Sequence, residues 1–423
     1  MAEILGAATT ATKLFLEVNQ VSIDNWTFKL FYKATTTLLL ALSVVSTSKQ
    51  FFGDPISCDV RKGGVNQDVL NSYCWMYSNF NIPPDFKGSC AKREYDGATL
   101  YNTYYQWVSL YLVFEAILFY LPRSIWLMLE GGLMKFLAKG ARGKIIEDAC
   151  EKRENLLRTF QEHLHNKYNS YAAGFICCEV FNVVIVLSQI FVTNRFLNHK
   201  FLDYGPQVYS YYSVPPEERL IRKMNPMCET FPRIAACDYI RFGSGGGQEN
   251  INAICILGLN MINDKIFLVL WYWYFFLLFL GSTRIVYRVV QLLSSRIRYQ
   301  MMKMKMHRYF KNNENIQHIK HYVYHCSIGD WFVLYQMSRN MNRRFFADFL
   351  VVLSKRVNPH PNAHCDEHPF FTETEINQKT TDVGETCDNS VHAHLDITYM
   401  GEEDKEDKES EKTNPGPKDV LGF

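Results

Sequence analysis

The sequence lacks the motifs that mark the common enzyme classes. Its 423 residues contain no HExxH zinc motif, no nucleophile elbow, no glycine-rich phosphate loop and no carboxylate pair in a recognisable catalytic context. Nor does one charge dominate, because 45 Lys and Arg stand against 43 Asp and Glu, whereas nucleic-acid-binding domains are usually strongly basic. We therefore predict neither an enzyme nor a nucleic-acid partner, and no catalytic residue, cofactor or metal.

The first 27 residues also lack the pattern of a secretory signal peptide. Such a peptide has a basic start and an uninterrupted apolar core, and Glu3, Glu17 and Asp24 break that pattern. Aromatic residues, in contrast, are abundant at 15% of the chain, and they cluster in its apolar stretches. That distribution is more typical of a membrane interface than of an ordinary core.

Four apolar runs are long enough to cross a bilayer, whose hydrocarbon core takes about 20 helical residues. Glu115 and Glu179 are the only charged residues in the second and third runs. The first run is weaker because it holds Lys29 and Lys33, whose long side chains can reach the interface. A buried core helix is the alternative for any single run. The runs are residues 28–48, 104–122, 174–194 and 266–283.

Basic residues near the ends of the runs predict their orientation, since Lys and Arg are retained on the cytoplasmic side. Residues 127–171 carry eight, and residues 290–311 carry six with no acid. Residues 51–103 and 197–265 are longer but more sparsely basic. We therefore place these two segments outside the cell and both termini in the cytoplasm.

Six of the 12 cysteines lie in the two outside segments, where an oxidising environment favours disulfides. Cysteines on the cytoplasmic side or within the spans, such as Cys150, Cys177, Cys178 and Cys326, are expected to be free thiols. The six outside cysteines are Cys58, Cys74, Cys90, Cys228, Cys237 and Cys255.

The C-terminal residues 356–423 are polar and rich in Pro, Asn and Thr, so they cannot bury enough apolar surface to fold alone. A zinc site around His360, His364, Cys365 and His368 is an alternative that spacing does not establish. The last four residues, VLGF, alternate apolar side chains and suit strand addition to a PDZ domain.

Several motifs in order along the chain resemble the innexins, the gap-junction proteins of invertebrates. The most specific is Tyr104, Tyr105, Gln106 and Trp107 at the start of the second run, the family signature. The resemblance covers roughly residues 1–355. The further matching stretches are AILFYLPRSIW (116–126), CEVFN (178–182), FPRIAACD (231–238), CILGLNMINDKIFLVLWYW (255–273) and SIGDWFVLYQMSRNMN (327–342).

The resemblance implies subunits that ring a central pore, with two rings docking through their outside segments. It also implies which cysteines pair, namely Cys58 with Cys255 and Cys74 with Cys237. Cys90 and Cys228 depart from the family pattern, so a third bridge between them and two free thiols both stay open.

The resemblance further implies that residues 1–27 fold into the cytoplasmic mouth of the pore, where Glu3 and Glu17 would tune charge selectivity. An interfacial helix on the inner leaflet is the alternative for this segment. The first span supplies hydroxyl groups, among them Thr35, that either face the pore or bond neighbouring backbone. Pro122, at the end of the second run, is a candidate gating hinge because proline interrupts helical hydrogen bonding.

The predicted fold class is an all-α membrane protein, a four-helix transmembrane bundle with disulfide-stapled extracellular loops and a helical cytoplasmic dome. The segments are an N-terminal pore-funnel helix (1–27), spans at 28–50, 104–126, 174–196 and 266–289, extracellular loops at 51–103 and 197–265, a cytoplasmic loop (127–173), a cytoplasmic helical region (290–355) and a disordered tail (356–423).

The predicted function is a subunit of a gap-junction channel in the plasma membrane, passing ions and small solutes between adjacent cells. The ring would contain other innexins, of the same or another kind, and by resemblance eight subunits. Membrane lipid and a PDZ protein are further predicted partners, and contact with anionic lipid is one interpretation of the basic helix at 296–310. Two alternatives stay open: an undocked, pannexin-like hemichannel and a non-conducting tetraspan adhesion or scaffold protein.

Overall fold

The structure is a computed structural model. The chain divides into two units, Met1–Pro361 and Asn362–Phe423, and every described residue belongs to the first. The described residues are 21–60, 65–77, 79–80, 101–102, 104–143, 146–163, 168–218, 225–243, 245–306 and 313–357.

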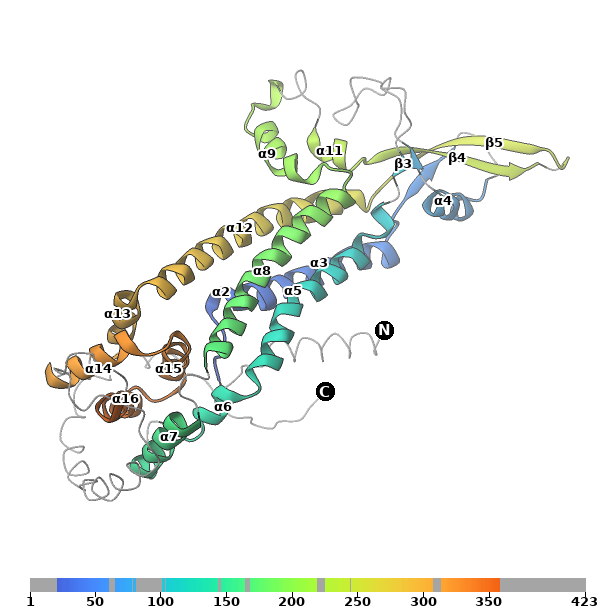
Figure 1. Ribbon diagram of the computed structural model, residues 1–423. Coiled ribbons are helices and arrows are strands. Elements are labelled where there is room, and N and C mark those ends of the chain that lie inside the picture. The colour runs from blue at the N-terminus through green and yellow to red at the C-terminus, as the bar shows by residue number, and fades with distance from the viewer. Residues whose placement is uncertain are drawn as a thin grey trace, which may run out of the picture. The chain divides into compact units, whose positions relative to one another are not determined.

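Four helices in the described part of the chain are long and apolar enough to cross a membrane, which confirms the predicted bundle. In Figure 1 they run side by side between a small sheet at one end and a group of shorter helices at the other. The fourth has 34 residues, or about 51 Å at 1.5 Å per residue, so it is longer than the hydrocarbon core is thick. The helices are Trp26–Phe52 (α2, η1 and α3 in series), α5 (Val108–Glu130), α8 (Asn169–Phe196) and α12 (Asn260–Leu293).

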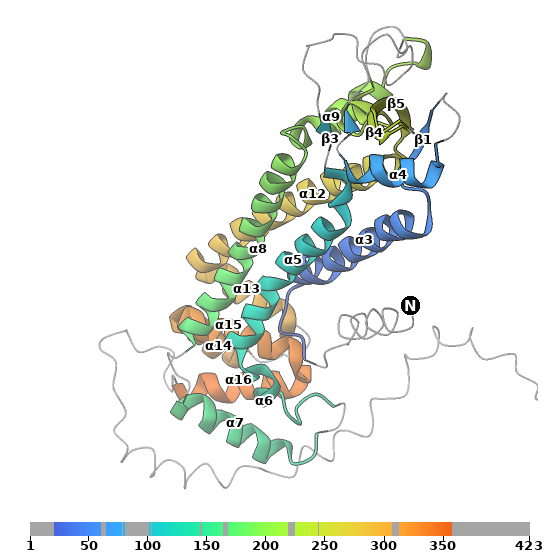
Figure 2. The same ribbon diagram turned by 90° about the vertical axis from the view of Figure 1, so that its right-hand side faces the viewer.

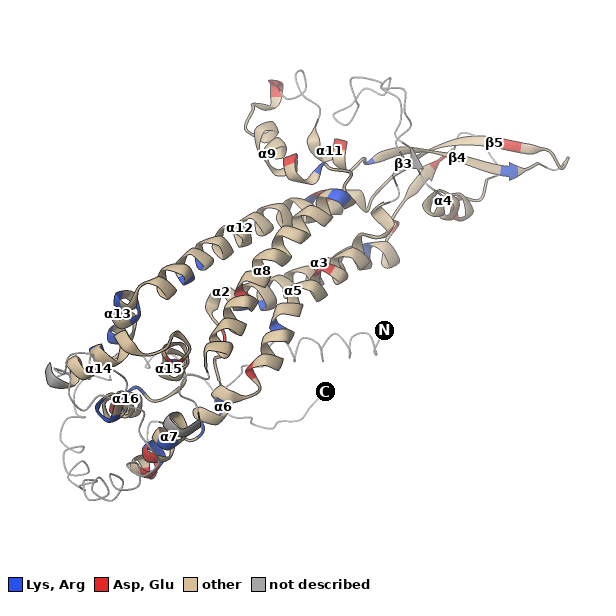
Figure 3. Ribbon diagram, viewed as in Figure 1, with Lys and Arg blue, Asp and Glu red and all other residues tan. Residues whose placement is uncertain are grey.

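The four helices pack in the order α3, α5, α8 and α12, and each contacts the next. Their shared core is apolar and aromatic, with Leu112, Phe119, Phe267 and Tyr274 among its fully buried side chains. Figure 3 shows that charged residues are sparse along the four helices and more frequent at their ends. Such a distribution is what a hydrocarbon environment requires.

A five-stranded antiparallel sheet lies at one end of the bundle, in strand order β1-β5-β4-β2-β3. Together with helices α4, α9 and α11 we call this region the sheet end. The sequence reasoning missed this sheet. Its elements are β1 (Ser57–Asp59), α4 (Gln67–Met76), β2 (Asn79–Phe80), β3 (Tyr101–Asn102), α9 (Phe201–Tyr212), α11 (Pro226–Thr230), β4 (Ile234–Phe242) and β5 (Gln248–Ile256).

Strands β4 and β5 form a hairpin that extends past the rest of the sheet (Figure 1). Its side chains alternate, with Ala235, Cys237, Ala253 and Cys255 buried on one face. The residues between them lie on the more exposed face. Small buried residues leave room for the disulfides described below.

The other end of the bundle is a group of helices with an aromatic and methionine-rich core, which we call the dome. Figure 2 shows α7, α14, α15 and α16 gathered there, beyond the ends of the long helices. Helix α15 begins at a cap in which the Ser327 hydroxyl accepts from the Asp330 backbone N–H at 3.1 Å. The dome consists of α6 (Leu133–Leu137), α7 (Ala149–His163), α13 (Ser295–Met306), α14 (Asn313–His325), α15 (Ile328–Asn340) and α16 (Arg343–Val357).

Candidate functional site

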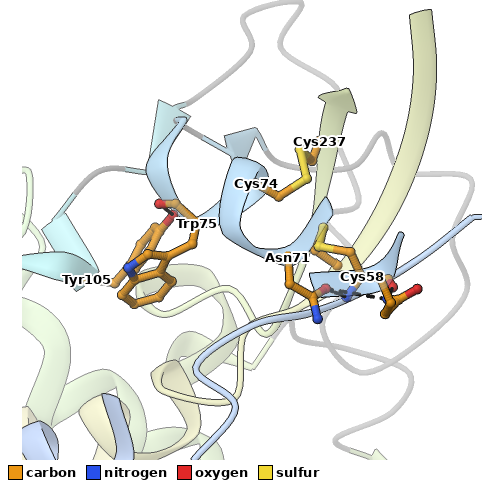
Figure 4. Close-up of a disulfide and its surroundings, with 8 residues drawn as sticks. Cys58, Asn71, Cys74, Trp75, Tyr105 and Cys237 are labelled. Atoms are coloured by element: carbon orange, nitrogen blue, oxygen red, sulfur yellow. Dashed lines mark hydrogen bonds between the residues drawn. A yellow bond between two sulfur atoms is a disulfide. The ribbon is translucent and has the colours of Figure 1, made fainter. Parts of the chain in front are cut away.

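Two disulfides link the two loops of the sheet end, with the predicted pairing. Cys58 bonds Cys255 and Cys74 bonds Cys237, across sequence separations of 197 and 163 residues. Cys58 and Cys255 are also register partners of β1 and β5, while Cys74 comes from α4 and reaches Cys237 on β4, as Figure 4 shows. The sulfur atoms of Cys58, Cys74 and Cys255 lie close together, but because all are in disulfides they are not free to bind a metal.

The remaining cysteines differ in how well the sequence predicted them. Cys177, Cys178 and Cys326 are free thiols, as expected. Cys150 in α7 is disulfide-bonded, which corrects the prediction of a free thiol there. The prediction rested on the compartment alone, and a compartment argument says nothing about which thiols lie close together.

Cys228, on α11 in the second loop, is buried and disulfide-bonded. Cys90 lies outside the described residues. A third bridge between Cys228 and Cys90 therefore stays a prediction, whereas the free-thiol alternative for Cys228 does not fit the structure.

The signature stretch connects the start of α5 to both loops of the sheet end. The hydroxyl of Tyr104 donates to the Thr230 carbonyl at 3.0 Å, and the amide of Gln106 donates to the Trp75 carbonyl. Tyr105 is buried against Trp75, with ring centroids 4.9 Å apart (Figure 4). Trp107 is different, because its side chain is 59% exposed and suits a membrane interface. Three of the four signature residues thus hold the loops onto the bundle.

Glu115 lies at the centre of a buried polar cluster between three spans. Its carboxylate accepts from Thr193 Oγ1 on α8 at 2.9 Å and from the Tyr274 hydroxyl on α12 at 2.6 Å. Tyr111, one turn earlier on α5, bonds the same threonine hydroxyl at 2.8 Å. The carboxylate is therefore buried inside the subunit, bonded to side chains of α8 and α12.

Glu179, on α8, is the second buried acid, and it is matched by two arginines of α12. Arg288 donates to both carboxylate oxygens at 2.5 and 3.1 Å, and Arg284 donates at 3.3 Å. The Arg288 guanidinium also lies 5.3 Å from the ring centroids of Phe175 and Phe332. Since Phe332 belongs to α15, this cluster joins two spans to the dome.

The hydroxyls of the first span divide into two groups. Thr35 is buried and accepts from the Trp273 indole N–H at 3.0 Å, and Ser43 donates to the Ser109 carbonyl at 3.0 Å. These two side chains bond neighbouring helices, so they have the packing role and not the pore-facing role that the sequence analysis left open. An exposed stripe runs along another face of the same helix at helical spacing. It consists of Thr37, Ala41, Val44 and Ser48.

Of the remaining predicted site residues, Pro122 is the one that lies within the described part of the chain. Pro122 is buried inside α5, which continues as helix to Glu130. Glu3, Glu17, the zinc candidates and the C-terminal VLGF motif lie outside the described residues.

Four membrane-spanning helices, with two loops stapled to each other by buried disulfides on one side, define a multi-pass membrane protein with an oxidised extracellular face. The sequence profile of the Innexin family matches residues 24–357. The chain therefore belongs to the innexin family. Innexins are subunits of gap-junction channels, so this chain is a multi-pass channel subunit of the gap junction, and the sheet end is extracellular.

Individual relatives agree with the family match. The chain is 32% identical to Innexin inx2 of Drosophila melanogaster over 360 residues, covering 82% of this chain and 95% of that protein. It is 33% identical to Innexin inx2 of Schistocerca americana over 359 residues, which cover 82% of this chain and 97% of that protein. It is 34% identical to Innexin shaking-B of Drosophila melanogaster over 357 residues, which cover 82% of this chain and 93% of that protein.

Proposed function

We propose that the chain assembles into a ring, by family resemblance an octamer, in which the stripe Thr37, Ala41, Val44 and Ser48 of the first span faces the pore. The observation that carries this proposal is the division of the first span's hydroxyls. Buried Thr35 and Ser43 are used within the subunit, whereas the stripe is small, uncharged and uncovered. Small and hydroxylated side chains suit a wide, water-filled passage for ions and small solutes.

The predicted funnel segment would be limited to residues 1–20, because the first span begins at Trp26 and Ser22 and Asp24 bond the dome and α5. It would enter the cytoplasmic mouth of this pore, with Glu3 and Glu17 influencing charge selectivity there. Pro122 would act as a hinge of the second span. Both termini would be cytoplasmic, and the charge of the dome supports this orientation, since the positive-inside rule retains basic segments in the cytoplasm. Helix α13 alone carries Arg296, Arg298, Lys303 and Lys305 and no acid.

The β4–β5 hairpin would carry the docking contact with a ring on the neighbouring cell. Near its tip Phe242 is 77% exposed, and Arg241 pairs with Glu249 at 3.0 Å. The disulfides support this role because they hold the base of the hairpin to the first loop. The ring would be homomeric or would include another innexin, with anionic lipid and a PDZ protein as further partners.

Single-particle imaging of the purified full chain tests the assembly. We expect rings of eight subunits, with some stacked end to end through their sheet ends. Rings that never stack, at any concentration, would favour the undocked hemichannel, and particles without a ring would favour a scaffold protein. Deleting residues 2–18 provides the matched variant, which should assemble normally and conduct differently.

A further inference from the structure

Two histidines lie one turn apart at the end of dome helix α14. His321 and His325 are four positions apart, and this spacing places two side chains on the same face of a helix. Their rings are stacked, with centroids 4.2 Å apart and planes inclined by 26°. His325 is the last residue of α14 and is exposed. The two rings are therefore close to each other and accessible from solution.

A hydrogen bond fixes the position of the proton on the His325 ring. Its Nδ1 lies 2.9 Å from the carbonyl oxygen of His321. Because a carbonyl oxygen can only accept, Nδ1 carries the proton, and in the neutral ring the lone pair belongs to Nε2. Metal-binding histidines commonly donate their other ring nitrogen to a carbonyl in this way, which orients the ring and raises its basicity.

The His321 ring has a nitrogen that the rest of the protein does not use. Its Nδ1 is buried and has no hydrogen-bond partner among the described residues, and the same is true of His318 Nδ1. Buried polar atoms without a partner are rare, and a water or an ion often accounts for them. His318 and His325 are about 10 Å apart along the helix axis, which is too far for one ion. The pair that could share an ion is therefore His321 and His325.

The position of the pair at the end of a helix favours a cation. The last turn leaves backbone carbonyls without helical partners and carries the negative end of the helix dipole. Lys320 is the one Lys or Arg of α14. Its ammonium group lies on the neighbouring face of the helix, 6.0 Å from the centroid of the Tyr324 ring. The face that carries the two histidines thus has no basic residue of α14.

We propose that His321 and His325 bind a divalent d-block metal ion of the Zn²⁺ type, with water completing its coordination. Imidazole nitrogens suit zinc, copper and nickel, whereas magnesium and calcium take oxygen ligands. The ion links two residues of the last turn of α14, directly before the Ser327 cap that begins α15. This inference goes beyond the proposed function, because the site needs neither a ring nor a pore.

Equilibrium dialysis of the detergent-purified full chain against Zn²⁺ tests the site. We expect His321→Ala and His325→Ala each to bind one Zn²⁺ fewer per chain than the reference protein. His199→Ala is the matched control, because His199 is an exposed histidine at the sheet end that lies 2.8 Å from Arg195, and it should bind as much as the reference. The reference is the full chain in which the alternative zinc ligands of the tail are replaced by Ala, namely His360, His364, Cys365 and His368.

Thermal melting separates loss of the site from loss of the fold. His325→Ala changes an exposed residue at a helix end, so without metal it should melt as the reference does. Zn²⁺ should raise the melting temperature of the reference by more than that of His325→Ala, because a ligand of the native state stabilises it. Mg²⁺ should raise neither. Equal Zn²⁺ uptake by the reference and both α14 variants, or an equal loss in His199→Ala, would overturn the inference.

Discussion

The sheet end and the dome are stabilised by different chemistry. At the sheet end, two disulfides connect segments 197 and 163 residues apart. The described contacts between the dome and the spans are instead hydrogen bonds and aromatic packing, such as the Gly329 N–H donating to Asn169 Oδ1 at 2.9 Å and the Phe332 ring lying 5.2 Å from that of Phe175. Covalent links suit a surface that must keep its shape in an oxidising medium. The contacts between the dome and the spans can rearrange without a covalent bond being broken.

Removal of both disulfides should produce the largest effect. Each bridge contributes about 2–4 kcal/mol by constraining the unfolded loops, so the variant with Cys58, Cys74, Cys237 and Cys255 all replaced by Ser should not form channels at the cell surface. Surface labelling and junctional current measure this loss. Cys177→Ser, at an exposed free thiol, is the control and should behave as the wild type. Normal junctional current from the quadruple variant would show that the sheet end does not depend on its disulfides.

Arg288→Ala should be the most damaging single change in the cluster that joins α8 and α12 to the dome. Removing one partner of a buried ion pair costs about 3–5 kcal/mol, because the other charge is left without compensation. Arg284→Ala is the matched variant, since Arg284 meets the same carboxylate at 3.3 Å but is 22% exposed, and its effect should be smaller. Thermal stability of the detergent-purified protein reports the difference, and equal loss in both variants would contradict the assignment of Arg288 as the main partner.

One glycine in the dome and one at the sheet end are each so closely packed that an added Cβ would clash with a neighbour. A Cβ at Gly329 in α15 would lie 2.2 Å from the Tyr168 backbone, whereas at Gly205 in α9 it would lie 2.3 Å from the Trp271 ring. A side chain can rotate away, but the backbone at the start of α8 cannot. Gly329→Ala should therefore cost about 1–3 kcal/mol from overpacking, with a smaller loss for Gly205→Ala. Melting temperatures in the reverse order would contradict this.

Glu115→Gln should have the smallest effect of these changes. The partners of Glu115 are the neutral hydroxyls of Thr193 and Tyr274, and an amide can keep such bonds with a change below about 1 kcal/mol. Glu179→Gln removes the charge that faces Arg288 and should cost more. Assembly and junctional conductance measure both variants. A loss of conductance in Glu115→Gln with normal assembly would show that the carboxylate has a role beyond packing.

The sequence predicts the bundle well because hydrocarbon leaves few alternatives for a long apolar helix. The disulfide pairing followed from family resemblance, and spacing alone would not have selected Cys58 with Cys255. The sheet was missed because its pairing joins β1 and β5 from loops far apart in the chain. Only the alternation of buried Ala235, Cys237, Ala253 and Cys255 could have indicated strands.

Side-chain orientation was the least predictable feature. The direction in which Thr35 or Tyr104 points depends on the rotation of each helix against its neighbours, and a single sequence does not determine that rotation. The contacts of α15 with residues 22–24 were equally inaccessible, because they join positions more than 300 residues apart in the chain.

Current between two adjoining cells that both express the chain is the most direct test of its role as an intercellular channel. Dual whole-cell recording should show junctional conductance when both cells express the wild type, and none when either cell expresses the variant without the four disulfide cysteines. Current across single-cell membranes with no junctional conductance at visible contacts would contradict docking and favour the undocked hemichannel. No current in either configuration, with the protein present at the surface, would contradict a channel formed by this chain alone.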